Sequence, residues 1–225
     1  ALQTIDPSIL VYGEGWTAGD SPLPVERRAL KAKVAQMPKV AAFSDDIRDG
    51  LKGSVFEHEE KAFISGKPGR KEDVKFGIVA STQHPQIDYE SVSYSDAPWA
   101  AHPIQTMTYV SCHDNHTLRD RLVLSCPEAN EEERIKMHKL ALAAVLTSQG
   151  GTFLHAGTEF LRTKQGVENS FESSDSINQI YWTRKAHHQE VVDYTKGLIA
   201  LRKAHPAFRM RTNAEVKKHL AFLPT

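Results

Sequence analysis

The chain has 225 residues, of which 40% are hydrophobic and 25% are charged. This balance supplies a folded core and excludes a disordered or fibrous protein. The 28 basic residues equal the 28 acidic residues, so no basic field favours nucleic acid and no acidic surface favours a charged partner. No apolar run approaches the ~18 residues of a membrane span. We therefore expect a globular piece whose partner is uncharged.

The two cysteines, Cys112 and Cys126, lack metal-ligand spacing and are too few for a disulfide framework. We expect both to be free or buried thiols. The first residues, ALQTIDPSIL, run from a short polar segment straight into an apolar one, whereas a domain boundary usually carries a polar linker. We therefore expect that a preceding part of the same domain is missing. Neither feature decides between a cytoplasmic and an exported protein.

Four short apolar runs, each rich in β-branched or aromatic residues, change abruptly to polar, glycine or acidic residues. They are residues 9–16 (ILVYGEGW), 39–50 (KVAAFSDDIRDG), 105–117 (QTMTYVSCHDNHT) and 150–160 (GGTFLHAGTEF). Each is typical of a buried parallel strand whose carboxyl end carries a functional loop. Long polar inserts over residues 50–100 and 162–185 are further candidates for functional loops.

Helical patterns separate these runs. Residues 131–149 carry a wide apolar face, with Asn130 as N-cap, Glu133 completing a capping box and Gly150 ending the helix. Residues 189–204 form a second amphipathic pattern, closed by His205-Pro206. Alternating strands and helices predict an α/β fold with a parallel sheet. Near the end, residues 219–223 (HLAFL) predict a strand that begins a following domain.

Two carboxylates, Glu14 and Asp114, come at predicted carboxyl ends of strands, where parallel α/β folds place their active sites. Glycoside hydrolysis needs a carboxylic acid for the leaving oxygen and a carboxylate beside the oxocarbenium-like centre. The glycines around Glu14 would allow a sharp turn, and Trp16 offers a flat face to a sugar ring. Taken singly, Glu14 also fits a solvated turn, Asp114 a helix N-cap, and His113 a core histidine.

Six elements that occur in this order resemble the second half of the catalytic domain of type I pullulanases, debranching enzymes of the α-amylase superfamily. They are YGEGW (12–16), FSDDIRDGLKGSVF (43–56), YVSCHDNHTL (109–118), FLHAGTEFLRTK (153–164), DSINQIYW (175–182) and LIALRKAHPAFR (198–209). The resemblance implies that residues 1–212 form about strands five to eight of a (β/α)8 barrel of the TIM type, with long βα loops. From the apolar residues near its end, we expect residues 213–225 to begin a C-terminal β domain.

The same resemblance implies roles for individual residues. Glu14 matches the general acid/base, Asp114 the acidic residue that stabilises the transition state, and His113 a histidine that binds sugar hydroxyls. Further substrate contacts are implied for Trp16, Asn115, Asp175 and Asn178. The substrate is then an α-glucan, cleaved with retention at α-1,6 branches of pullulan, glycogen or starch-derived dextrins.

The nucleophile that the family carries, an aspartate in an RFD strand end, has no match in this sequence. We therefore expect the chain alone to be inactive and the N-terminal half of the barrel to be its partner. No cofactor is required. Calcium ligation by Asp45, Asp46 and Asp49 is conceivable, but a solvated helix start is favoured. The alternatives are an α-1,4-acting amylase or branching enzyme of the superfamily, or a non-catalytic α-glucan-binding barrel.

Overall fold

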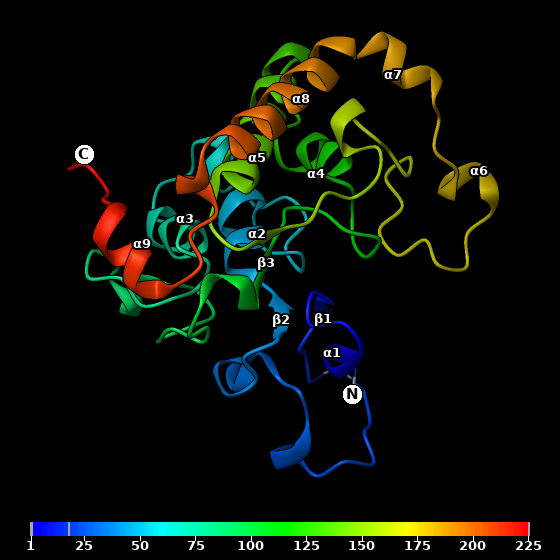
Figure 1. The fold of residues 1–225 in the computed structure, drawn as a ribbon. Coiled ribbons are helices and arrows are strands. Elements are labelled where there is room, and N and C mark those ends of the chain that lie inside the picture. The colour runs from blue at the N-terminus through cyan, green and yellow to red at the C-terminus, as the bar shows by residue number, and fades with distance from the viewer. Residues whose placement is uncertain (1, 18, 225) are drawn as a thin grey trace.

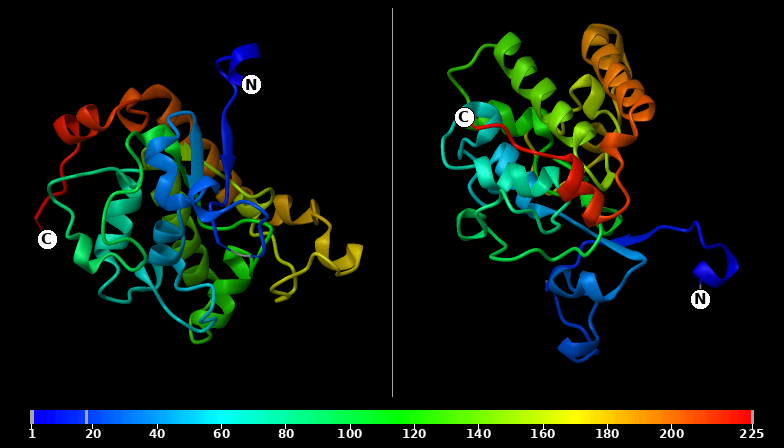
Figure 2. Two further views of the ribbon diagram at one scale, coloured as in Figure 1. Left: turned by 90° about the horizontal axis from the view of Figure 1, so that it is seen from below. Right: turned by 60° about the vertical axis from the view of Figure 1, so that its left-hand side comes forward.

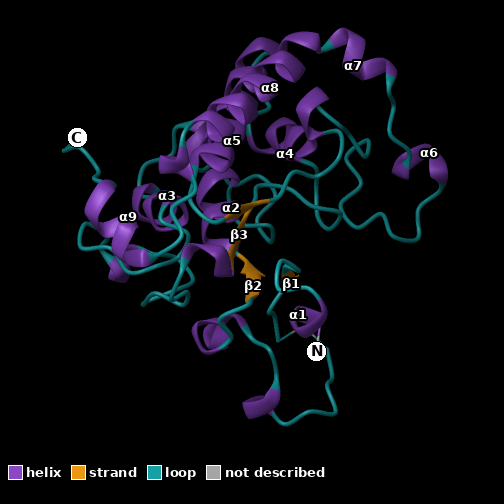
Figure 3. Cartoon of the chain, viewed as in Figure 1, coloured by secondary structure: helices purple, strands orange, loops and turns teal. Residues whose placement is uncertain are grey.

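Four parallel strands run through the protein, whose computed structural model describes residues 2–17 and 19–224. The strands are β1 (Val11–Gly13), β2 (Val40–Phe43), β3 (Thr106–Thr108) and β4 (Gly151–Thr152), hydrogen-bonded in that order. Their carboxyl ends therefore lie at the same edge of the sheet (Figures 1 and 3). Each strand lies within one of the predicted apolar runs, so the α/β class and the parallel sheet are confirmed.

The helices pack around this sheet. They are α1 (Leu2–Ile5), α2 (Asp45–Lys52), α3 (Lys71–Ile78), α4 (Leu118–Ser125), α5 (Glu131–Thr147), α6 (Asp175–Asn178), α7 (Thr183–His187), α8 (Gln189–Ala204) and α9 (Asn213–His219). Short 3-10 turns cover Val25–Arg27, Lys31–Gln36, Phe63–Ser65, Tyr89–Ser91, Pro103–Gln105, Thr158–Phe160 and Pro206–Phe208. The N-terminal segment projects from the body formed by the larger helices (Figures 1 and 2). Across the described residues, every helix is too short or too polar to cross a bilayer.

The long helix α5 begins as predicted. The Asn130 side chain accepts a hydrogen bond from the Glu133 amide at 3.0 Å, and the Glu133 carboxylate accepts one from the Asn130 amide at 2.8 Å. The helix ends at Thr147, two residues earlier than predicted, because Ser148 is already extended. Gly150 instead makes the turn into β4, with φ +82°, where a Cβ atom would lie 2.8 Å from two backbone oxygens. The second predicted helix matches α8.

The main hydrophobic core lies among the helices on one side of the sheet. It is formed by buried side chains of α2 to α5 and their neighbours, namely Ile47, Leu51, Ile64, Val74, Val110, Leu118, Leu122, Ala141 and Val145. A second cluster packs Val216 of α9 against Val34, Phe76 and Trp99. Since successive side chains of a strand point to opposite faces, Phe43 turns away from the side on which Ala42 joins the second cluster.

The strand predicted over residues 219–223 is wrong. His219 ends α9, and residues 220–224 contain no strand. The backbone of Phe222 is instead held by the side chain of Gln86, which accepts from its amide at 2.9 Å and donates to its carbonyl at 2.8 Å. One amide side chain thus takes both backbone groups that a neighbouring strand would bind. The β domain expected from residue 213 stays a prediction, and its outer limit, Thr225, lies outside the described residues, as does Ala1.

Two of the three acidic residues at the start of α2, Asp46 and Asp49, are buried and Asp45 is partly buried, so the predicted solvated helix start is wrong for Asp46 and Asp49. Asp46 is fully buried, and its Oδ2 accepts a hydrogen bond from the Trp99 indole at 3.2 Å. The Lys31 ammonium pairs with Asp45 at 2.5 Å and lies 3.5 Å from Asp46. Burial raises the pKa of Asp46, although the Lys31 charge opposes that rise. Asp49 is buried as well and pairs within α2. Protein donors therefore explain most of this cluster.

Candidate active site

The loop after β1 carries Glu14 and Trp16 to the carboxyl edge of the sheet. Its shape depends on Gly15, whose φ of +74° lies in the left-handed region and whose carbonyl accepts from the Lys31 amide at 2.9 Å. A Cβ atom on Gly15 would lie 2.9 Å from that same nitrogen. At Gly13 a Cβ atom would meet nothing within 4 Å. Of the two glycines around Glu14, Gly15 is the one that the backbone requires.

The loop after β3 presents His113 and Asp114. Asn115 follows with a φ of +59°, a conformation that asparagine tolerates, and its amide donates to Asn169 at 3.4 Å. The N-cap of the next helix is Thr117, so the N-cap interpretation of Asp114 is wrong. The side chain of His113 is 75% exposed, which rules out a core histidine.

Glu14, His113 and Asp114 meet although they come from different loops. One ligand-type atom of each lies within 4.8 Å of the others, and Nδ1 of His113 is 3.0 Å from Oδ1 of Asp114. All three line a cavity of about 250 Å³, together with Trp16 and Asn115. All three are also exposed, and their spacing would suit a cation as well as a sugar. The structure thus brings five of the seven predicted site residues into one hollow.

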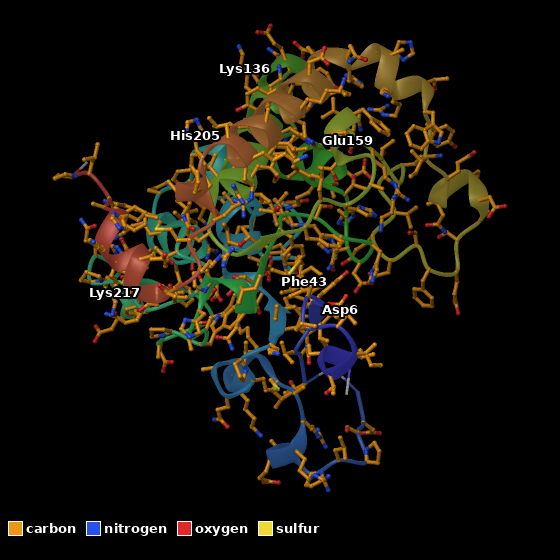
Figure 4. All side chains as sticks on the ribbon, in the orientation of Figure 1. Asp6, Phe43, Lys136, Glu159, His205 and Lys217 are labelled. Atoms are coloured by element: carbon orange, nitrogen blue, oxygen red, sulfur yellow. The ribbon has the colours of Figure 1, made fainter. Side chains whose placement is uncertain are left out.

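Four aromatic rings that sequence reasoning missed line this cavity, one from each strand or the residue after it: Tyr12, Phe43, Tyr109 and Phe153. Phe43, labelled in Figure 4, is central, with its ring centroid 4.8 Å from Tyr109, 5.1 Å from Phe153 and 5.8 Å from Tyr12. Tyr109 is buried and accepts from Arg48 at 2.9 Å. Burial raises the pKa of its phenol. The signal in the sequence was an aromatic residue near the end of each predicted strand.

A second cavity, of about 270 Å³, adjoins the first and shares His113 and Asp114 with it. Its other lining residues are His155, Arg162, Lys164, Ser170, Phe171 and Asn178. Arg162 donates to Nε2 of His155 at 3.1 Å, and burial lowers the pKa of His155 to about 4, so this imidazole is neutral. Phe171 is 83% exposed and offers a flat apolar face. Sequence reasoning singled out the run that contains His155 but not the residue.

Asp175 and Asn178 lie apart from Glu14. Asn178 borders the second cavity, but its amide nitrogen donates to the carbonyls of Ser170 at 2.6 Å and Ser173 at 3.0 Å. The Asn178 side chain was predicted to contact the substrate, but in the structure its amide nitrogen stabilises the loop. Asp175 is the exposed first residue of α6 and lines neither cavity.

Lys164 joins the two loops that form the second cavity. This side chain is almost completely buried, and its ammonium donates to the carbonyls of His113 at 3.0 Å and Glu168 at 2.5 Å. Its own amide donates to Asp120 at 2.7 Å. Local patterns could not predict this contact, because 51 positions separate Lys164 from His113.

The two cysteines are free, as predicted. Cys112 lines the first cavity, and burial raises the pKa of its thiol, so the group is protonated at neutral pH. Cys126 is buried within the protein.

Comparisons with known proteins show extensive similarity over this chain. No protein-family model matches it. Pullulanase from Bacillus subtilis (strain 168) is 42% identical over 217 residues, which cover 96% of the chain and 29% of the relative. Pullulanase 1, chloroplastic, from Arabidopsis thaliana is 30% identical over 247 residues, 91% of the chain and 25% of the relative.

Solved structures agree. The pullulanase from Paenibacillus barengoltzii, in complex with maltohexaose and α-cyclodextrin, matches with a TM-score of 0.90 and 48% identity over 100% of the chain and 33% of its own length. Pullulanase type I from Bacillus subtilis, complexed with maltose, matches with a TM-score of 0.90 and 41% identity, over 99% of the chain and 30% of its own. The chain thus spans a third or less of these relatives.

Proposed function

We propose that this chain, which belongs to the pullulanase family, supplies part of an active site that hydrolyses α-1,6-glucosidic branches in pullulan, glycogen or starch-derived dextrins. The observation that carries the proposal is the convergence of Glu14, His113 and Asp114 within 4.8 Å at the carboxyl edge of a parallel sheet. The linkage and the substrates rest on the similarity to pullulanases. The maltooligosaccharides bound by the neighbours support an α-glucan as ligand.

The proposed architecture is one half of a (β/α)8 barrel, with β1 to β4 as its fifth to eighth strands. In the described sheet, β1 and β4 each have one hydrogen-bonded neighbour, and a closed barrel would pair both outer edges. The aromatic rings under the cavity, including the half-exposed Tyr12, would then be covered by the other half. We infer that a segment outside this chain forms the other half of the barrel. This agrees with the chain spanning only about a third of the length of its relatives.

In the proposed retaining mechanism, an aspartate of the other half attacks the anomeric carbon while the glycosidic C–O bond breaks. Glu14 gives its proton to the departing oxygen, and as a carboxylate it then takes a proton from the water that hydrolyses the glycosyl-enzyme. Asp114 stabilises the positive charge at the anomeric carbon, and His113 donates to a sugar hydroxyl. Trp16 provides an apolar face for a ring. These steps need no cofactor.

The nucleophile has no counterpart in this sequence. We therefore propose that the isolated chain does not hydrolyse α-glucans, although Glu14 and Asp114 are both present.

The experiment that tests the proposal is Glu14→Gln in the intact protein that carries this sequence, assayed on pullulan. Loss of the transferable proton should lower kcat by about 10²- to 10⁴-fold and leave the Kd for maltooligosaccharides nearly unchanged. Glu26→Gln, an exposed position outside both cavities, is the matched control. Near-normal turnover by Glu14→Gln would exclude Glu14 as the acid/base.

The products separate the alternatives. Maltotriose from pullulan indicates cleavage of α-1,6 linkages, whereas panose-type products indicate an α-1,4-acting enzyme. Affinity for maltodextrin without hydrolysis by the unaltered intact protein would indicate a binding module.

A further inference from the structure

Three side chains outside the catalytic cluster converge where three loops meet. His58 follows α2, His116 precedes α4, and Glu168 follows the turn after β4. Nε2 of His58 lies 3.2 Å from Oε1 of Glu168, and the two imidazole rings meet edge to face with centroids 4.7 Å apart. One ligand-type atom of each residue lies within 4.8 Å of the others.

The buried member of the trio, His116, has one ring nitrogen bound by the protein. His116 is 6% exposed, and its Nε2 lies 3.2 Å from the carbonyl oxygen of Gly166. Because a carbonyl only accepts, Nε2 carries the proton and Nδ1 keeps its lone pair. Metal-bound histidines usually donate their other ring N–H to a carbonyl or carboxylate in this way.

The loops that carry His116 and Glu168 are tied together by the protein itself. Lys164 donates to the carbonyls of His113 and Glu168, and the Asn115 amide donates to Asn169 at 3.4 Å. An ion would therefore find two of its ligands already in place. The third, His58, has a side chain that is 40% exposed and is free to adjust its distance.

We propose that His58, His116 and Glu168 form a zinc site. Two histidines and one glutamate are a recurring donor set for Zn²⁺, with water in the fourth position. Tetrahedral bonds of about 2.0–2.1 Å place neighbouring donor atoms roughly 3.3 Å apart, close to the separation between His58 and Glu168. The ion would link the loop after α2 to the loop of Asp114 and to the loop that borders the second cavity, and would fix the approach to the substrate.

The test is a titration of the metal-free intact protein with Zn²⁺, read by calorimetry and by competition with a chromophoric chelator. One equivalent should bind, and His58→Ala and Glu168→Gln should each weaken its Kd by about 100-fold or more, since second-shell changes alone cost 10- to 100-fold. With Co²⁺ as the probe, the unaltered protein should show the intense visible absorption of a four-coordinate ion. Circular dichroism confirms that each variant is folded, and Glu168→Gln, a change at a part-exposed side chain, serves if His58→Ala does not fold.

Two controls separate this site from other binding. His187→Ala removes an exposed histidine of α7 and should leave the Zn²⁺ affinity unchanged. Asp114→Asn tests the other cluster with cation-like spacing and should also leave the affinity unchanged. The proposal fails if no equivalent binds, if binding survives both His58→Ala and Glu168→Gln, or if it is lost with Asp114→Asn instead. None of these results depends on hydrolysis, so the proposed function stands or falls separately.

Discussion

The ammonium of Lys164 donates to the carbonyl of His113 at 3.0 Å, directly before Asp114 in the chain. The same ammonium binds the carbonyl of Glu168, and both contacts lie in the interior, because Lys164 is 1% exposed. A buried cation thus sets the position of a loop whose two cavity residues, His113 and Asp114, are themselves exposed. Lys164 is a positioning residue for the candidate active site.

We expect Lys164→Met to lower the free energy of unfolding by about 2–4 kcal/mol, because the carbonyls of His113 and Glu168 lose charge-assisted hydrogen bonds from a buried ammonium. Urea denaturation of the intact protein measures the change. Lys136→Met, at an exposed lysine of α5 labelled in Figure 4, should stay within about 0.5 kcal/mol of the unaltered protein. Equal stabilities for the two variants would show that Lys164 does not hold the loop.

The positive φ of Asn115 predicts an order among its substitutions. Glycine adopts this conformation without strain, whereas the β-branched valine does not. The greater freedom of glycine in the unfolded chain lowers the stability of Asn115→Gly, and the backbone strain lowers that of Asn115→Val. The strain is the larger effect, so the Asn115→Val variant should be less stable than the Asn115→Gly variant by about 1 kcal/mol. Thermal unfolding of both variants checks the difference. A valine variant as stable as the glycine variant would mean that the loop adopts another conformation.

Lys52 should make stability rise at alkaline pH. Burial lowers the pKa of its ammonium from 10.5 to about 8, and the neighbouring Arg48 adds to the decrease. Between these values the unfolded chain binds a proton that the folded protein has released, so stability due to Lys52 rises with pH and levels off above about 10.5.

The variant Lys52→Met should lack this rise and should be more stable than the unaltered protein at pH 7, by about 3 kcal/mol. Denaturation at intervals from pH 7 to 10.5 measures both effects. Lys185→Met, at an exposed position in α7, should follow the unaltered protein. Parallel pH profiles for Lys52→Met and the unaltered protein would contradict the assignment.

His138 should contribute to unfolding in acid. It is completely buried in α5, where its Nε2 donates to the carbonyl of Thr158 at 2.8 Å. Burial lowers its pKa from 6.5 to about 4, although the Thr158 carbonyl opposes the decrease. The unfolded chain therefore binds the extra proton between these values, and stability falls as pH decreases from about 6.5 to about 4.

The variant His138→Gln keeps a donor for Thr158 and removes the titration. Its loss of stability over this pH range should be smaller by about 3 kcal/mol. His187→Gln, an exposed change in α7, should leave the acid profile unaltered. A profile for His138→Gln that matches the unaltered protein would assign the acid sensitivity to other groups.

The features that sequence reasoning predicted correctly depend on neighbours in the chain. The start of α5 follows from the capping pair Asn130 and Glu133, whereas Gly150 placed the end of the helix two residues too late. The strand ends follow from abrupt changes of residue type, and these changes located Glu14 and Asp114. Since parallel strands end at one edge, the meeting of these two carboxylates could also be predicted.

The features that it missed depend on distant partners. Asp46 is buried where Lys31 and Trp99 contact its Oδ2, and nothing beside Asp46 in the sequence indicates either partner. The strand predicted around Phe222 fails because Gln86, 136 positions away, takes its backbone hydrogen bonds. Pattern and propensity act within a few residues, whereas these contacts are set by tertiary packing.

The position of β1 at the margin of the sheet has a consequence for motion. Among the described strands, β1 is bonded to β2 alone, whereas β2 and β3 are each bonded on both sides. Local opening costs least where hydrogen bonds and buried contacts are few, so the amides of β1 should exchange with deuterium before those of β2. Any opening of β1 also carries Glu14 away from Asp114. If a strand of the proposed other half pairs with β1, the exchange of the β1 amides should slow markedly, so that isotope exchange at Tyr12 and Gly13 reports whether the loop of Glu14, the proposed acid/base, is held in place.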